Sequence, residues 1–104
     1  MERTSIERIL MERFELTEED LAVAEGKFFG AEGRLGILPA KNRNKAAVYI
    51  RLATRFDLGR AYAEAEVNEI LTQAVDDYAT FRRALIDHGL LSRSRDGRTY
   101  WRNA

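Results

Sequence analysis

Arginines concentrate near the carboxyl end of the chain, around a sequence typical of a tight turn. Residues 91–102 read LSRSRDGRTYWR and also contain the only tryptophan, Trp101. Guanidinium groups on a hairpin can straddle a DNA backbone and bind phosphates, or enter a minor groove. We therefore predict phosphate contacts from Arg93, Arg95, Arg98 and Arg102.

A second polar group lies on the helix expected just before this segment. Apolar side chains recur at helical spacing in residues 75–89, and the predicted inner stripe is Tyr78, Phe81 and Leu85. With Tyr78 placed at 0°, the side chains between about 140° and 200° face outward. They are Thr80, Arg83 and Asp87, and we predict that Arg83 and Thr80 contact bases.

The remaining basic side chains receive different predictions. Arg82 falls at about 40°, beside the core stripe, so we expect it to pair with an acid such as Glu66 or Glu69 rather than to contact DNA. Three others precede or begin a predicted helix, where they could bind phosphates or simply face solvent as part of a loop: Lys41, Arg43 and Lys45.

Acidic residues oppose this interpretation. The 17 basic and 17 acidic residues give a net charge of zero. Residues 1–40 hold five basic and nine acidic residues, a balance of −4, so the remainder carries +4. Asp76 and Asp77 stand at the start of the proposed DNA-reading helix and Asp87 on its outward face, where each repels phosphate. Five or six phosphate contacts would give modest affinity at cellular salt.

The sequence does not indicate an enzyme, a metal site or a cofactor. His88 is the only histidine, and it ends a predicted helix, where an imidazolium interacts well with the helix dipole. There is no cysteine. Asp76 and Asp77 are adjacent on a helix and diverge, so capping explains them better than paired acid–base chemistry.

Five helices and three short strands are expected to position these groups. The helices are predicted over 4–14, 18–29, 44–56, 63–74 and 75–89, with a short strand at 61–62. The expected caps are Thr4 or Ser5, Thr17, Asn44, and Asp76 or Asp77, whereas Ala63 is a poor cap. Gly89 suits the left-handed position that ends a helix.

A hairpin is predicted around Asp96-Gly97, because both residues tolerate positive φ in a two-residue turn. This turn would pair Arg95 with Arg98, and further along the strands Ser94 with Thr99, Arg93 with Tyr100, and Ser92 with Trp101. Tyr100 shares a face with Leu91 and is expected inward. Trp101 is expected to be partly exposed or covered by the N-terminal segment; burial under the first helix is the alternative.

This order of elements predicts a mainly α protein with a small β-hairpin. Helix, strand, helix, helix and hairpin follow one another in a winged helix-turn-helix. We assign residues 1–36 to an N-terminal helical extension and 37–104 to the winged helix-turn-helix domain, in one compact unit. The sequence contains no apolar run that could span a membrane and no signal peptide, so we expect a cytoplasmic protein.

Several blocks of the sequence resemble the bacterial domain of unknown function 2087. They read LPAK, YAEAEVNEIL, DDYATFRRALIDHGLLSR and DGRTYWR, and they cover about the last two thirds of the chain. The resemblance implies a winged-helix-like fold and a link to transcriptional regulation. One departure is Ala63, where a capping Ser or Thr would be usual.

The function predicted from these features is that of a transcriptional regulator that binds double-stranded DNA. The alternative is a winged-helix protein–protein interaction module within a regulatory complex. The first helix also carries an apolar stripe that must be covered, by its own domain or by a second copy: Ile6, Ile9, Leu10 and Phe14. We expect a homodimer through this helix.

Overall fold

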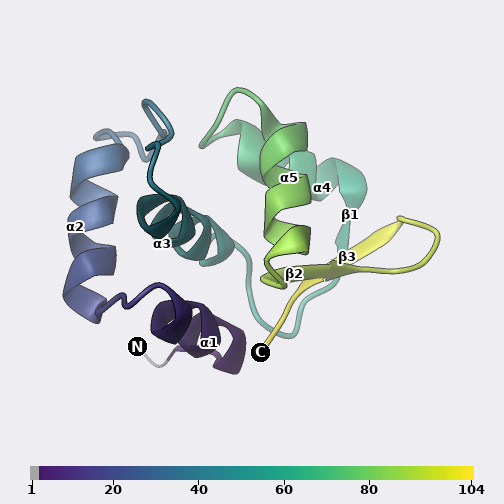
Figure 1. Cartoon of the computed structure of the whole chain (residues 1–104). Coiled ribbons are helices and arrows are strands. Elements are labelled where there is room, and N and C mark those ends of the chain that lie inside the picture. Colours follow the sequence, from purple (N-terminus) through teal and green to yellow (C-terminus); the bar gives the residue numbers. More distant parts are fainter. Residues whose placement is uncertain (1–2) are drawn as a thin grey trace.

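The computed structural model describes residues 3–104, so residues 1–2 of the predicted extension lie outside the described residues (Figure 1). The elements are α1 (Ser5–Arg13), α2 (Glu18–Phe28), α3 (Asn42–Ala53), β1 (Tyr62–Ala63), α4 (Glu64–Thr72), α5 (Tyr78–Asp87), β2 (Leu91–Arg93) and β3 (Thr99–Arg102). The prediction of a mainly α chain with a small hairpin is confirmed. None of the helices described is long and apolar enough to span a membrane.

Local capping explains where the first two helices begin. The Thr4 hydroxyl accepts from the backbone N–H of Glu7, whose carboxylate accepts in return from the N–H of Thr4. Thr17 and Asp20 form the same reciprocal pair at the start of α2. Each box satisfies two backbone donors that a helix start would otherwise leave unpaired. The prediction of Thr17 as a cap is thus confirmed. At the first helix the cap is Thr4, one of the two predicted candidates.

Helix α3 forms the centre of the molecule. Residues 46–50 are all buried, because α1, α2 and α5 pack around this helix. The predicted cap is wrong: α3 begins at Asn42, two residues before Asn44, and Lys41 precedes it without a side-chain cap bond. Phe56, just beyond the helix, is buried as predicted. The core is therefore continuous across the predicted boundary at residue 36.

A three-stranded antiparallel sheet follows, in the order β1-β3-β2. Ser92 pairs with Trp101 and Arg93 with Tyr100, as predicted. The predicted turn is wrong by one position. The N–H of Gly97 donates to the carbonyl of Ser94 at 2.9 Å, so Arg95 and Asp96 are the central residues and Arg95 does not pair with Arg98. Of the Asp96-Gly97 pair, Gly97 alone has positive φ, at 72°.

The helix pair α4 and α5 packs on α3 and the sheet (Figure 1). Ala63 gives α4 no side-chain cap, but the Glu66 carboxylate accepts from the Ala63 N–H at 2.9 Å. Asp77 caps α5, one of the two predicted candidates, and Gly89 ends it with φ of 76°. Strand β1 begins at Tyr62, one residue later than expected.

Two predicted apolar stripes are only partly buried. Tyr78 is 39% exposed, whereas Phe81 and Leu85 are buried as expected. In α1, Leu10 is buried but Ile9 is 52% exposed, and the carboxylate of Glu7 lies inside instead. Helical spacing alone did not reveal that Glu7 has a buried partner on β3. Leu10 is covered within the chain itself, so part of the stripe needs no second copy.

Candidate nucleic-acid interface

The outward face of α5 lies beside the hairpin formed by β2 and β3. Thr80, Arg83 and Asp87 are all exposed on α5, as their angular positions predicted. Between this helix and the sheet is a pocket of about 480 Å³. It is lined by Glu64, Ala79, Thr80, Arg82, Arg83, Ile86, Asp87, Arg93 and Tyr100. The structure thus brings three of the predicted site residues together, Thr80, Arg83 and Arg93.

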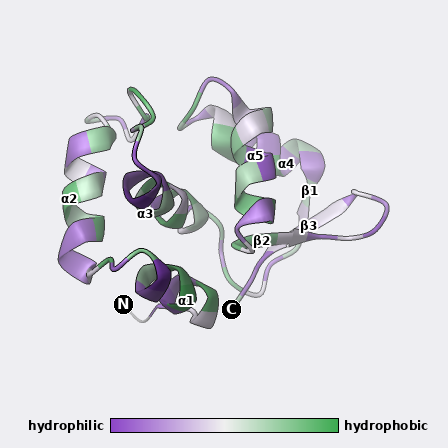
Figure 2. Cartoon of the chain, viewed as in Figure 1, coloured by the Kyte–Doolittle hydropathy of each residue, from purple (hydrophilic) through white to green (hydrophobic). Residues whose placement is uncertain are grey.

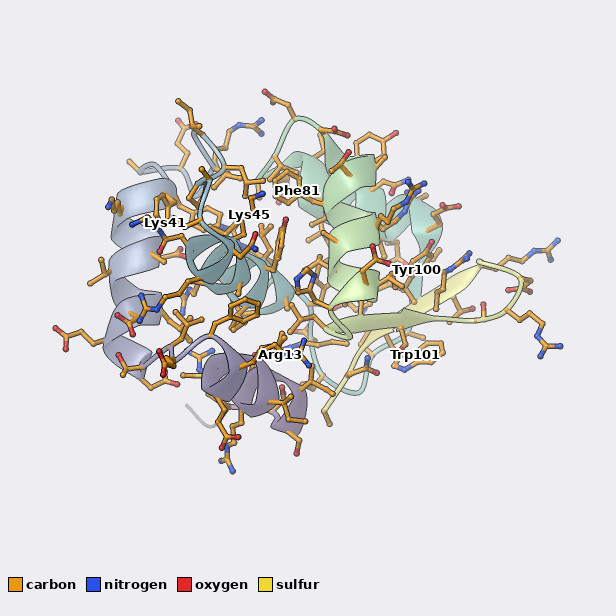
Figure 3. The ribbon with its side chains drawn as sticks, viewed as in Figure 1. Arg13, Lys41, Lys45, Phe81, Tyr100 and Trp101 are labelled. Carbon is orange, nitrogen blue, oxygen red and sulfur yellow. The ribbon has the colours of Figure 1, made fainter. Side chains whose placement is uncertain are left out.

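Tyr100 forms part of this pocket from the sheet side. Its side chain is 3% exposed, which confirms the inward prediction, whereas Trp101 is 38% exposed. The two labelled side chains point to opposite sides of the hairpin in Figure 3, as alternation along a strand requires. The ring of Tyr100 is packed in the core.

Arg82 is held by neighbouring polar groups. It donates to the Asn68 side chain and lies 3.3 Å from Glu64 Oε1. The predicted pairing of Arg82 with an acid beside the core is confirmed, but the acid is Glu64 instead of the examples Glu66 and Glu69. Glu66 pairs with Arg60 at 2.9 Å. Glu64 comes at the start of α4, where the strand-to-helix connection brings it over α5. Its charge in the pocket is therefore compensated by Arg82.

Thr80 also has an internal partner. Its hydroxyl donates to Asp77 Oδ2 at 2.6 Å, and its N–H donates to Oδ1 of the same residue. These two hydrogen bonds hold the pKa of the Asp77 carboxyl below its usual range. Thr80 is therefore left with a lone pair and a methyl group to offer a ligand.

Three hairpin arginines reach solvent without forming ion pairs within the described residues: Arg93, Arg95 and Arg98. The loop that joins β2 and β3 is coloured hydrophilic in Figure 2. Asp96 lies between two of these arginines and accepts from the Ser94 hydroxyl and the Arg98 N–H. These bonds lower the pKa of the Asp96 carboxyl, so the turn keeps one negative charge at neutral pH.

Two residues predicted to contact DNA are engaged elsewhere. Arg43 donates to the carbonyls of Phe14 and Glu15 and pairs with Asp20 at 2.9 Å, which fixes the turn between α1 and α2. Arg102 is only 11% exposed in its side chain and pairs with the buried Glu7. The structure therefore gives Arg43 and Arg102 stabilising contacts within the chain, and phosphate contacts from these two residues stay predictions.

The other two predicted contacts lie away from the hairpin. Lys41 is exposed and Lys45 half-buried at the start of α3. Figure 3 shows both labelled side chains on the opposite side of α5 from Tyr100 and Trp101. Both belong to the beginning of α3, and neither lines the pocket.

The acids at the start of α5 are partly neutralised. Asp76 pairs with Arg34, which also donates to the carbonyl of Thr72 at 2.7 Å. Asp77 is turned back to cap its own helix. Asp87, by contrast, forms no ion pair among residues 3–104. Asp87, one turn after Arg83, is therefore an acid of α5 whose repulsion of phosphate no cation within the described chain offsets.

Sequence reasoning missed the pocket itself and the residues that enclose it from outside α5. Glu64 and Tyr100 come from different elements, and only the folded chain places them opposite Ile86. The exposure of Tyr78 was also missed; the polar residues around it gave a weak signal. Residues 3–104 hold no cluster of three or more His, Asp or Glu side chains that could bind a metal.

Comparison with protein families identifies a match over most of the chain. The family described as "Uncharacterized protein conserved in bacteria (DUF2087)" matches residues 34–102, which is more than half of the chain. The match begins after α2 and includes every element from α3 to β3. Neither a curated protein nor a solved structure matches the chain.

Proposed function

The chain belongs to the DUF2087 family, and we propose that it is a DNA-binding transcriptional regulator with a winged helix-turn-helix. The observation that carries the proposal is a set of four exposed arginines on α5 and the adjoining hairpin, without ion pairs among the described residues. They are Arg83, Arg93, Arg95 and Arg98.

The order of elements supports this proposal. From α3 onward the chain runs helix, strand, helix, helix and hairpin, and β1 pairs with β3 to complete the sheet. In a winged helix-turn-helix the second helix of the pair enters the major groove. Here that helix is α5, which presents an exposed polar face beside the hairpin.

The hairpin then acts as a wing that binds the backbone. Arg95 and Arg98 lie on the loop between β2 and β3, which extends away from the body of the molecule (Figure 1). Contacts of this kind depend on charge and carry no sequence information. Lys41 and Lys45 add positive charge on the other side of α5. Bases would be read from α5, and a Thr80 contact would use its methyl group or its hydroxyl oxygen as an acceptor, because the hydroxyl proton is donated to Asp77.

Trp101 favours a second candidate, a protein–protein interaction module. It is 38% exposed on the side of the sheet that faces away from Tyr100. Exposed aromatic side chains are enriched at the centre of protein interfaces. The two functions use different sides of the hairpin, so substitutions separate them. Trp101→Ala should leave DNA binding unchanged.

A duplex-binding titration with charge-matched variants tests the proposal. A fluorescent DNA duplex is titrated at about 50 mM salt, where phosphate contacts are strong. Arg95→Gln with Arg98→Gln should weaken binding by about tenfold or more. Arg8→Gln with Arg13→Gln removes the same charge from exposed positions on α1 and should change it far less. Equal losses in the two double variants would indicate nonspecific attraction and argue against the wing.

A further inference from the structure

We propose that the pocket between α5 and β3 binds a phosphate ester, held by Arg83 and Arg93. A role of this pocket in DNA binding rests on the proposed function. Its ability to bind a phosphate group does not depend on that function. The pocket has a volume of about 480 Å³, which lies in the range of pockets that hold small ligands. A duplex lying across an exposed helix needs no such hollow.

The guanidinium groups define the class of ligand. Arg82, Arg83 and Arg93 contribute three positive charges, against Glu64 and Asp87. Glu64 is compensated by Arg82 at 3.3 Å. Arg83 and Arg93 are exposed and without ion pairs among the described residues, so they can turn to a bound anion. A guanidinium matches two oxygens of a phosphate at once, which makes this group the best fit.

The rest of the lining positions the ester. Tyr100 supplies a side chain at the wall of the pocket, on a ring that is fixed in the core. Ala79 and Ile86 give the pocket an apolar side. Asp87 can accept hydrogen bonds from a hydroxyl or amino group on the organic part of the ester. A sugar phosphate has groups that match these parts of the lining, whether it is a free nucleotide or part of a DNA strand.

This assignment makes Arg83 a phosphate contact instead of the base contact predicted from its position on the helix. Arg83→Gln should therefore reduce the affinity of the protein for duplexes of different sequence by the same factor. A change in their ranking would show that Arg83 reads bases and would overturn the assignment.

Calorimetric titration of the full chain with adenosine 5′-monophosphate, with adenosine as the control, tests the site directly. We expect binding that adenosine lacks, about tenfold weaker in Arg83→Gln and in Arg93→Gln, and unchanged in Arg13→Gln on the exposed side of α1. Tyr100→Phe keeps the packed ring and should reduce the affinity for the nucleotide by a smaller factor than the arginine variants do. Circular dichroism confirms that each variant is folded.

A parallel titration with DNA separates the two sources of the ester. If the nucleotide does not bind but Arg93→Gln weakens duplex binding more than Arg98→Gln, the pocket takes a backbone phosphate of DNA. If the nucleotide binds and no duplex does, the site stands and the proposed function fails. Equal effects of Arg93→Gln and Arg13→Gln on every probe, or no binding of any probe, would overturn the site.

Discussion

Glu7 on α1 and Arg102 on β3 are 95 residues apart and form an ion pair, with Arg102 Nη2 2.7 Å from Glu7 Oε1. Both side chains are largely buried, at 1% and 11% exposure. Arg102 also donates to the carbonyl of Phe56 at 3.1 Å. The pair therefore joins the first helix to the last strand and to the end of α3, across the start of the DUF2087 match.

Removing one partner of this pair should destabilise the fold strongly. Glu7→Ala leaves Arg102 buried without its carboxylate, and we expect a loss of about 3–5 kcal/mol in the free energy of unfolding. Urea unfolding measures the loss, with Glu12→Ala on the exposed face of α1 as the control. The double change Glu7→Leu with Arg102→Met should recover much of it. A small loss in Glu7→Ala would mean that water reaches the pair.

The hairpin turn depends on Gly97, which has φ of 72°. A Cβ there would also lie 3.0 Å from Arg93 Nη1. Gly97→Val should destabilise the chain by about 1–2 kcal/mol, because a β-branched residue resists the left-handed region. Gly26→Ala should have the opposite effect, because a Cβ at this position of α2 would meet open space. This substitution should stabilise the folded chain by about 0.5–1 kcal/mol. Thermal unfolding of both variants checks the two signs.

The cap of α5 should make stability depend on pH. The pKa of Asp77 is lowered in the folded state, so its contribution is present above the unfolded pKa, about 3.9. It is lost as the pH falls through the lower folded value. Asp77→Ala should therefore reduce the urea midpoint at pH 7 more than Asp76→Ala does, and the difference should shrink at acid pH. A difference that persists unchanged under acid conditions would contradict this.

The position of α1 also bears on assembly. Leu10 is covered within the chain, so deletion of residues 1–15 should abolish cooperative unfolding even in a monomer. The homodimer through this helix stays a prediction, and Ile9, at 52% exposure, is the part of the stripe left to form it. Sedimentation equilibrium of Ile9→Glu should then show a folded monomer where the parent chain dimerises. A monomeric parent chain at high concentration would exclude the dimer.

Local signals in the sequence predicted much of this structure. Caps such as Thr17 and Asp77, and the strand pairing of Arg93 with Tyr100, depend on residues close together in the chain. The outward position of Arg83 followed from helical periodicity alone. The roles of Arg43 and Arg102 could not be predicted, because their partners Asp20 and Glu7 come from distant elements. The pocket was missed for the same reason.

The salt dependence of duplex binding is the most direct test of the proposed DNA interface. With four arginines on phosphates, log Kobs should fall against log salt with a slope of about −3 to −4. The double variant Arg95→Gln with Arg98→Gln should flatten that slope by about 2. An absence of duplex binding at about 50 mM salt, or a slope that the double variant leaves unchanged, would contradict the proposal.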